Sequence, residues 1–184
     1  MEKPLILTPD SLSPIYRENL LESLTKTGFK LITSDLVMNN HPPPYGQYSA
    51  TFSQSNLLYV ETFTPADSAV IYSILNENMG LTIYECTALH QACCHKGVLF
   101  TENGSLAKLA RSMGITTLDF IGYLGEMLRR SNLSLPEAVT CYCRIYQTSI
   151  SARKFNHMIR YFTDNKIISI NRDDDGIATL KQVI

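Results

Sequence analysis

Short apolar runs alternate with helix-forming segments from residue 5 to residue 130. The apolar runs have the length of buried strands, and the segments between them carry helical periodicity and capping residues. Strands that alternate with helices form a parallel sheet covered by helices on both faces. We therefore predict an α/β domain with a central, mostly parallel sheet, whose strands lie at residues 5–8, 29–33, 57–63, 98–101 and 115–118.

Two helix starts are marked by their capping residues. Ser13 followed by Pro14 predicts a helix that runs from there to Gly28, with the serine as cap and the proline at the first helical position. Thr82 with Glu85 three residues later is a capping box, which predicts a helix that continues to about residue 95.

The last third of the chain follows a different pattern. Residues 134–162 are expected to be helical, and residues 167–170 and 177–180 can pair as a hairpin across an Asp-Gly turn. The three aspartates at 173–175 are more typical of that turn than of a calcium loop. We expect an α/β domain over residues 1–140 and a C-terminal helix and hairpin over residues 141–184, packed on the same domain.

Composition excludes several classes of protein. The chain has sixteen Lys and Arg and seventeen Asp and Glu, a net charge of -1. This charge gives no bulk attraction to nucleic acid, but it does not exclude a local basic patch. No apolar run reaches the roughly 18 residues of a membrane span, and the N-terminus lacks a secretory signal pattern. An odd number of cysteines, five, fits a reduced protein. We expect a cytoplasmic protein with no membrane partner.

Acidic residues follow the predicted strands, where a parallel sheet binds its ligands. They are Asp10, Asp35 and Glu102, and Glu85 lies at a helix start. Carboxylates that converge on one sheet edge are the ligands that Mg²⁺ prefers. Each also has a structural interpretation, because Asp10 is a common turn residue, Glu85 completes a capping box and Glu102 can be a solvated loop residue.

Three segments in this order resemble the PIN-like domains, the α/β nuclease-type fold of many prokaryotic toxin–antitoxin pairs. The first is a strand followed by Asp10 and Ser11, and the second is the helix start that contains Glu85. The third is the strand and loop at residues 97–106, where the family has a threonine, one or two acids and then a helix. The resemblance covers roughly residues 3–140.

The resemblance implies a metal-dependent ribonuclease. On this view Asp10 and Glu85 bind Mg²⁺ or Mn²⁺ with help from Glu102, and Asn40 and Asn103 act as neutral ligands or hold waters. The metal would activate a water for attack on an RNA phosphodiester. An antitoxin-like protein and a homodimer are the protein partners that the resemblance suggests.

The chain departs from the family pattern at two of the expected acids. These positions fall on Asn39-Asn40 and on Asn103, and asparagine offers a carbonyl oxygen without a charge. Asp35 lies near the first of them but about one helical turn out of register. The alternative is therefore a catalytically degenerate PIN-like domain that binds protein or nucleic acid, with the Pro- and Tyr-rich residues 41–55, an expected loop, as a candidate partner surface.

Basic residues suggest where nucleic acid would bind. Arg129 and Arg130 close one predicted helix, and Arg153 and Lys154 lie in the following helical region, with tyrosines nearby for stacking. The structural alternative is that the arginine pair complements a helix C-terminus and that the other two lie on a solvated face.

A thiol or zinc site is a weaker hypothesis. His90, Cys93, Cys94 and His95 lie within two turns of one predicted helix, and no second cysteine pair has a zinc-like spacing. Packing as small core residues is the simpler interpretation of the cysteines.

Overall fold

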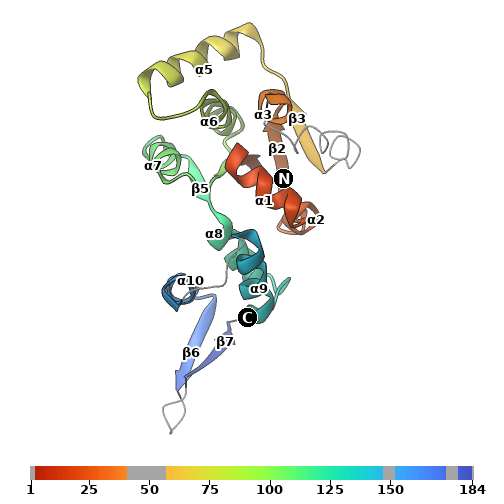
Figure 1. Cartoon of the computed structure of the whole chain (residues 1–184), viewed down its shortest axis with the longest axis vertical. Helices are drawn as coiled ribbons and strands as arrows, with labels where there is room; N and C mark the ends of the chain where they lie inside the picture. The colour runs from red at the N-terminus through yellow and green to blue at the C-terminus, as the bar shows by residue number, and fades with distance from the viewer. Residues whose placement is uncertain (1–2, 41–56, 147–151, 173–177, 184) are drawn as a thin grey trace. The chain divides into compact units, whose positions relative to one another are not determined.

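The five apolar runs pair in one parallel sheet in the computed structural model, which describes residues 3–40, 57–146, 152–172 and 178–183 (Figure 1). The strand order is β3-β2-β1-β4-β5, and every neighbouring pair is parallel. The predicted α/β class is thus confirmed. The strands are β1 (Lys3–Leu7), β2 (Phe29–Ser34), β3 (Leu58–Glu61), β4 (Val98–Phe100) and β5 (Thr116–Leu118).

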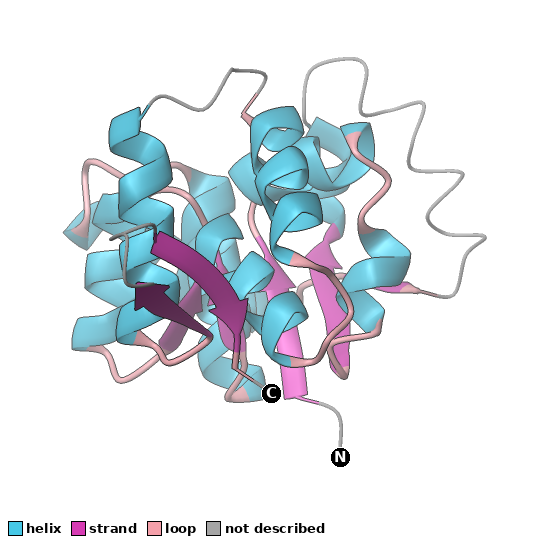
Figure 2. Cartoon of the chain, turned by 90° about the horizontal axis from the view of Figure 1, so that it is seen from below, coloured by secondary structure: helices cyan, strands magenta, loops and turns pink. Residues whose placement is uncertain are grey.

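Contacts within the chain define two units, residues 1–119 and residues 120–184. We call them the sheet unit and the helical unit. The division predicted at residue 140 lies inside the helical unit. In the described part of the sheet unit, one or two helices lie between consecutive strands. Figure 2 shows helices around the strands. Its helices are α1 (Pro9–Arg17), α2 (Leu21–Thr25), α3 (Asp35–Asn40), α5 (Pro65–Glu77), α6 (Ile83–His95) and α7 (Gly104–Ser112).

The first helix differs from its prediction. It begins at Pro9 instead of Pro14, after Thr8, whose backbone N–H donates to Ser11 Oγ at 3.0 Å. Pro14 lies inside the helix, and Asn19 has a left-handed φ of 52°, so the expected single helix is divided into α1 and α2. As a result, Asp10 belongs to the first turn of a helix.

The core of the sheet unit follows from strand alternation. Ile6, Ile32 and Leu99 are buried among apolar side chains of α5, α6 and α7. Their neighbours Leu5 and Leu7 are equally buried and point to the opposite face, because successive side chains of a strand alternate. The sheet therefore has apolar contacts on both faces, which leaves its two ends for polar chemistry.

The described residues of the helical unit form three helices and a two-stranded sheet. The predicted hairpin is confirmed, because Ile168 to Arg172 pairs antiparallel with Ala178 to Gln182. The Asp-Gly turn between these strands, like residues 41–55, lies outside the described residues. No helix in the described ranges is long and apolar enough to cross a membrane. The elements are α8 (Phe120–Arg129), α9 (Leu135–Ile145), α10 (Ala152–Asp164), β6 (Ile168–Arg172) and β7 (Ala178–Gln182).

Candidate functional site

The strand order reverses between β1 and β4, because β2 and β3 extend the sheet on one side of β1 while β4 and β5 extend it on the other. Parallel α/β sheets bind ligands at the carboxyl ends of the strands beside such a switch point. Asp10 follows β1, and Glu102 and Asn103 follow β4. The sequence-predicted residues therefore lie where the topology favours a site.

Asp10 is bonded to the loop that follows β4. Its Oδ2 atom accepts hydrogen bonds from Thr101 Oγ1 at 3.0 Å and from the backbone N–H groups of Glu102 and Asn103 at 2.7 and 2.9 Å. Its Oδ1 atom accepts a hydrogen bond from the Thr8 hydroxyl. The half-buried carboxylate thus fastens the end of β1 to the start of α7.

Asn103 connects this loop to α6. Its Oδ1 atom accepts from the backbone N–H groups of Ser105 and Leu106 at 2.9 and 3.3 Å, which caps α7. Its Nδ2 atom donates to Glu85 Oε1 at 2.5 Å. Because the capping oxygen must face two N–H donors, the amide nitrogen is the atom that faces the carboxylate.

The second carboxylate oxygen of Glu85 bonds within its own helix start. Its Oε2 atom accepts from the backbone N–H of Thr82 at 2.7 Å and from the Thr82 hydroxyl at 2.9 Å. The predicted capping box at the start of α6 is confirmed. Together with the Asn103 contact, it leaves each Glu85 oxygen bonded to a protein donor.

The residues that would hold Mg²⁺ or Mn²⁺ do not fit a cation in this arrangement. All four carboxylate oxygens of Asp10 and Glu85 accept hydrogen bonds from the protein, and Asn103 turns N–H groups toward Glu85. No group of three His, Cys, Asp or Glu side chains in the described ranges could hold a metal ion. Glu102 has an exposed side chain, and the side chain of Asn40 lies outside the description.

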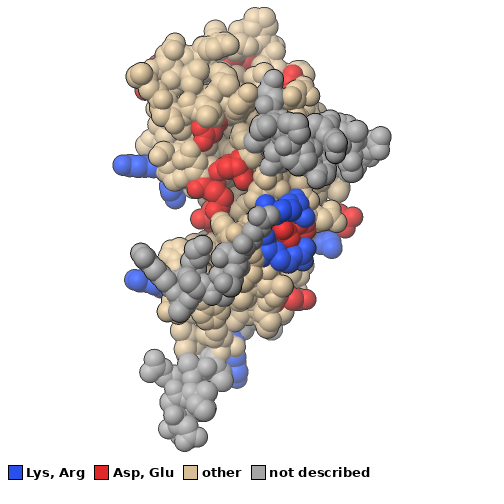
Figure 3. All heavy atoms as spheres, in the orientation of Figure 1, with Lys and Arg blue, Asp and Glu red and all other residues tan. Residues whose placement is uncertain are grey.

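The wider edge of the sheet is acidic. Each of the five strands ends in an acidic residue or is followed by one within three residues. Figure 3 shows acidic side chains gathered between α6, α7 and the start of α1. Asp35, the other acid considered from the sequence, accepts a hydrogen bond from the backbone N–H of Leu36 at 2.7 Å. The five residues are Asp10, Asp35, Glu61, Glu102 and Asp119.

A second polar cluster links α6 to β3 and α5. His90 Nε2 lies 3.1 Å from Asp67 Oδ1, and His95 Nε2 lies 3.0 Å from Glu61 Oε2. Gln91 Nε2 donates to the same Glu61 oxygen at 2.8 Å. Sequence reasoning singled out the histidines but missed their acidic partners, which lie 23 and 34 residues away. The cluster holds helices to the sheet.

Two titratable groups in this cluster have shifted pKa values. Hydrogen bonds from Thr64, and then the contact with His90, lower the pKa of Asp67 to about 2. Partial desolvation of the thiol raises the pKa of Cys94, although the residue as a whole is exposed, and the nearby Asp67 charge adds to that effect. A raised pKa disfavours the thiolate, so the contact of Cys94 Sγ with His90 Nε2 at 3.6 Å does not make an activated nucleophile.

The cysteines only partly follow their prediction. All five are free, and Cys86 is buried as a core residue. Cys93 and Cys94 are exposed, which corrects the view that they fill the core. Both lie in the last turn of α6 and are exposed to solvent there, whereas Cys86 is buried in the first turn of the same helix.

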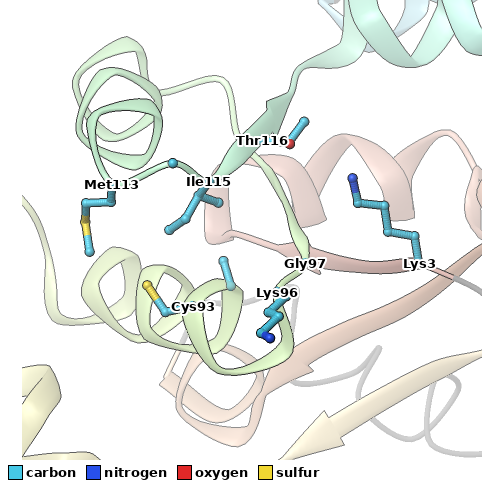
Figure 4. Close-up of a pocket in the computed structure, with 9 residues that line it drawn as sticks. Lys3, Cys93, Lys96, Gly97, Met113, Ile115 and Thr116 are labelled. Atoms are coloured by element: carbon cyan, nitrogen blue, oxygen red, sulfur yellow. The ribbon is translucent and has the colours of Figure 1, made fainter.

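A cavity of about 300 Å³ lies at the opposite end of the sheet (Figure 4). Its lining includes the start of β1 at Lys3, the start of β5 at Thr116, and Cys93 and Lys96 from the end of α6. It therefore lies away from the switch point, at the amino ends of the strands.

The basic residues predicted to bind nucleic acid all fall in the helical unit. Arg129 and Arg130 both form ion pairs with Glu126 of the same helix, the second at 3.9 Å. The sequence alternative was that the pair complements a helix C-terminus; the contacts seen here are ion pairs with a neighbouring acid. Arg153 and Lys154 occupy the first turn of α10, and their side chains lie outside the description.

No protein-family model matches the chain, and no curated protein matches its sequence.

Proposed function

We propose that the sheet unit is a catalytically degenerate PIN-like domain that acts as a binding module. The observation that carries this proposal is the hydrogen bond from Asn103 Nδ2 to Glu85 Oε1. In a metal-dependent nuclease of this kind, a cation joins the acids at the sheet edge. Here an amide joins Glu85 to the loop that holds Asp10, and it needs no ion to do so.

The same contacts argue against a loosely formed metal site. Asp10 accepts four hydrogen bonds and Glu85 accepts three. A cation would have to replace several of these donors, including two backbone N–H groups at the start of α7. A backbone N–H that loses its carboxylate acceptor must find another partner, so displacing these donors reduces the net free energy gained from binding a cation.

The acidic edge favours a protein as the partner over RNA. Carboxylates without a bound cation repel a phosphate backbone, whereas they attract a segment rich in Lys or Arg. Glu102 and Asp119 are exposed at this edge. A basic segment of a partner protein is therefore the partner that matches the charge.

A metal-dependent ribonuclease is the second candidate function. It is favoured by one observation, that the loop after β4 connects Asp10 and Glu85 beside the switch point of the sheet. The two candidates make opposite predictions about RNA cleavage.

The test is cleavage of a structured RNA with Mn²⁺ or Mg²⁺ by the wild type, Asp10→Asn and Glu85→Gln. We expect no cleavage by the wild type above that of Glu77→Gln, a control that changes an exposed glutamate on α5. Cleavage by the wild type and the control that is lost in both site variants would establish the ribonuclease and contradict the binding module.

The partner is tested separately by titrating a labelled Lys- and Arg-rich peptide into the protein. We expect binding that weakens with salt and weakens further in a Glu102→Gln, Asp119→Asn double variant. Binding that is equal in this variant and in Glu77→Gln would show that the acidic edge is not the binding surface.

A further inference from the structure

We propose that the helical unit binds double-stranded DNA, with α10 in the major groove. This inference goes beyond the proposed function, which concerns the sheet unit. In the part of this unit that the structure describes, three helices are followed by an antiparallel ribbon (Figure 1). In helix-turn-helix proteins, the second of two helices joined by a short connection enters the groove. Six residues, 146–151, separate α9 from α10, which is longer than the roughly three or four of a helix-turn-helix, so the assignment of α10 rests on its exposed side and its charge.

The packing fixes which side of α10 faces outward. Met158, Ile159 and Phe162 are buried, and α10 packs against α8 and β6. Gly125 of α8 allows this approach, because a Cβ at that position would lie 2.8 Å from Ile167 Cδ1 and 3.5 Å from a ring carbon of Phe162. The helix is thus anchored along one side by the core of its own unit.

The other side of α10 is exposed and polar. Asn156, His157 and Arg160 are exposed, and they lie three, four and seven positions after Arg153, so the four positions form one stripe along the helix. These residue types donate to base edges or phosphates: arginine to guanine and asparagine to adenine are the common pairings. The stripe therefore carries the side chains that direct recognition needs.

Charge along α10 also matches a phosphate backbone. Its first twelve residues contain Arg153, Lys154 and Arg160 and no acid. The one acid is Asp164 at the end of the helix, which lies 3.7 Å from Arg160 in an exposed ion pair. A pair this exposed is weak and can open when a phosphate approaches.

The ribbon that follows supplies further cations. Ile167, directly before β6, donates to Phe162 O at 2.8 Å, and Val183 after β7 donates to Ile167 O at 2.9 Å. These bonds attach the ribbon to the end of α10. Lys166 and Lys181 are exposed beside it. The unit as a whole has nine Lys and Arg against six Asp and Glu, a net charge of +3.

Geometry selects DNA over duplex RNA. With 13 residues, α10 is about 20 Å long, and the major groove of B-form DNA is wide enough for a helix. The major groove of A-form RNA is deep and narrow and does not admit one. The partner is therefore a B-form duplex.

The test is fluorescence anisotropy with the full chain and a mixed-sequence DNA duplex of about 20 base pairs, two helical turns. We expect affinity to fall about tenfold or more between about 50 and 200 mM salt. Arg160→Ala should weaken binding roughly 5- to 100-fold, with a smaller salt dependence if it contacts phosphate. Arg111→Ala, an exposed arginine on α7 of the sheet unit, is the matched control and should bind like the wild type.

Arg153→Ala tests the first turn of the stripe, and circular dichroism of each variant checks that α10 still folds. Three results would overturn the proposal: no binding of the duplex by the wild type, equal binding by Arg160→Ala and Arg111→Ala, or tighter binding of the same sequence as duplex RNA. Because all changes but the control lie in the helical unit, failure here leaves the proposed function of the sheet unit untouched.

Discussion

The two units of this chain carry opposite charges. The sheet unit has seven Lys and Arg against eleven Asp and Glu, a net charge of -4, whereas the helical unit has a net charge of +3. The value of -1 for the whole chain conceals this division. It gives no sign of the acidic sheet edge or of the cationic stripe on α10, so a charge argument must be made for each unit.

The units also differ in how they use their charged side chains. In the sheet unit, Asp10 and Glu85 accept hydrogen bonds from donors in other elements and so hold the fold together. In the helical unit, Glu126 pairs with Arg129 of its own helix α8, and Asp164 pairs with Arg160 of its own helix α10. Asp10 and Glu85 thus connect separate elements, whereas the ion pair of Arg160 with Asp164 is local and exposed.

The largest expected effects come from removing a core phenylalanine from either unit. Phe100 in β4 and Phe162 in α10 are fully buried, and replacing either by alanine should lower the free energy of unfolding by about 3–5 kcal/mol. Hydrogen exchange followed by mass spectrometry would locate the loss. We expect Phe100→Ala to increase exchange in residues 1–119 and to leave DNA binding by the helical unit intact. Equal loosening of both units by each variant would contradict the division.

The next effect concerns the amide of the candidate site. Asn103→Asp keeps an oxygen to cap α7 but replaces the donor to Glu85 with a second carboxylate. Without metal, we expect the free energy of unfolding to fall by about 1–3 kcal/mol, measured by urea denaturation. Asn103→Ser is the control, because it can still cap the helix and adds no charge, and it should cost less. A neutral effect of Asn103→Asp would mean that the contact with Glu85 is unimportant.

The smallest effect is a pH dependence in the second polar cluster. Because the pKa of Asp67 falls from 3.8 to about 2, its ionised form is favoured in the folded state. Its contribution to stability is therefore present above pH 4 and is lost as the pH falls toward 2. The difference in free energy of unfolding between the wild type and Asp67→Asn should shrink over that range. If urea denaturation gave the same difference in free energy of unfolding between the two proteins at pH 5 and at pH 3, the ionised Asp67 would not be the source of this stability.

Much of the sheet unit could be predicted from local sequence. The apolar runs located all five strands, and the pattern of Thr82 and Glu85 located the start of α6. The start of α1 was missed because two Ser/Thr-Pro signals compete there, Thr8-Pro9 and Ser13-Pro14. The structure uses the first, where Ser11 accepts a bond from the Thr8 backbone.

The candidate site was predictable as a set of residues but not as a set of bonds. Asn103 before Gly104 and Ser105 is a local capping signal, so its oxygen could have been assigned. Its bond to Glu85 joins residues 18 apart and depends on how α6 packs on the sheet. The contact between His90 and Asp67 also joins residues far apart in the sequence and depends on how their helices pack. The stripe on α10 needed the structure, because only its packing shows which side of the helix is exposed.

Titration with Mn²⁺ followed by calorimetry tests the central claim most directly, namely that the amide of Asn103 stands where a cation would join the acids. The account predicts no saturable binding by the wild type and saturable binding by Asn103→Asp, lost again when Glu85→Gln is added. Saturable binding by the wild type that disappears in Asp10→Asn and Glu85→Gln would contradict it, and would show that the sheet edge holds a metal after all.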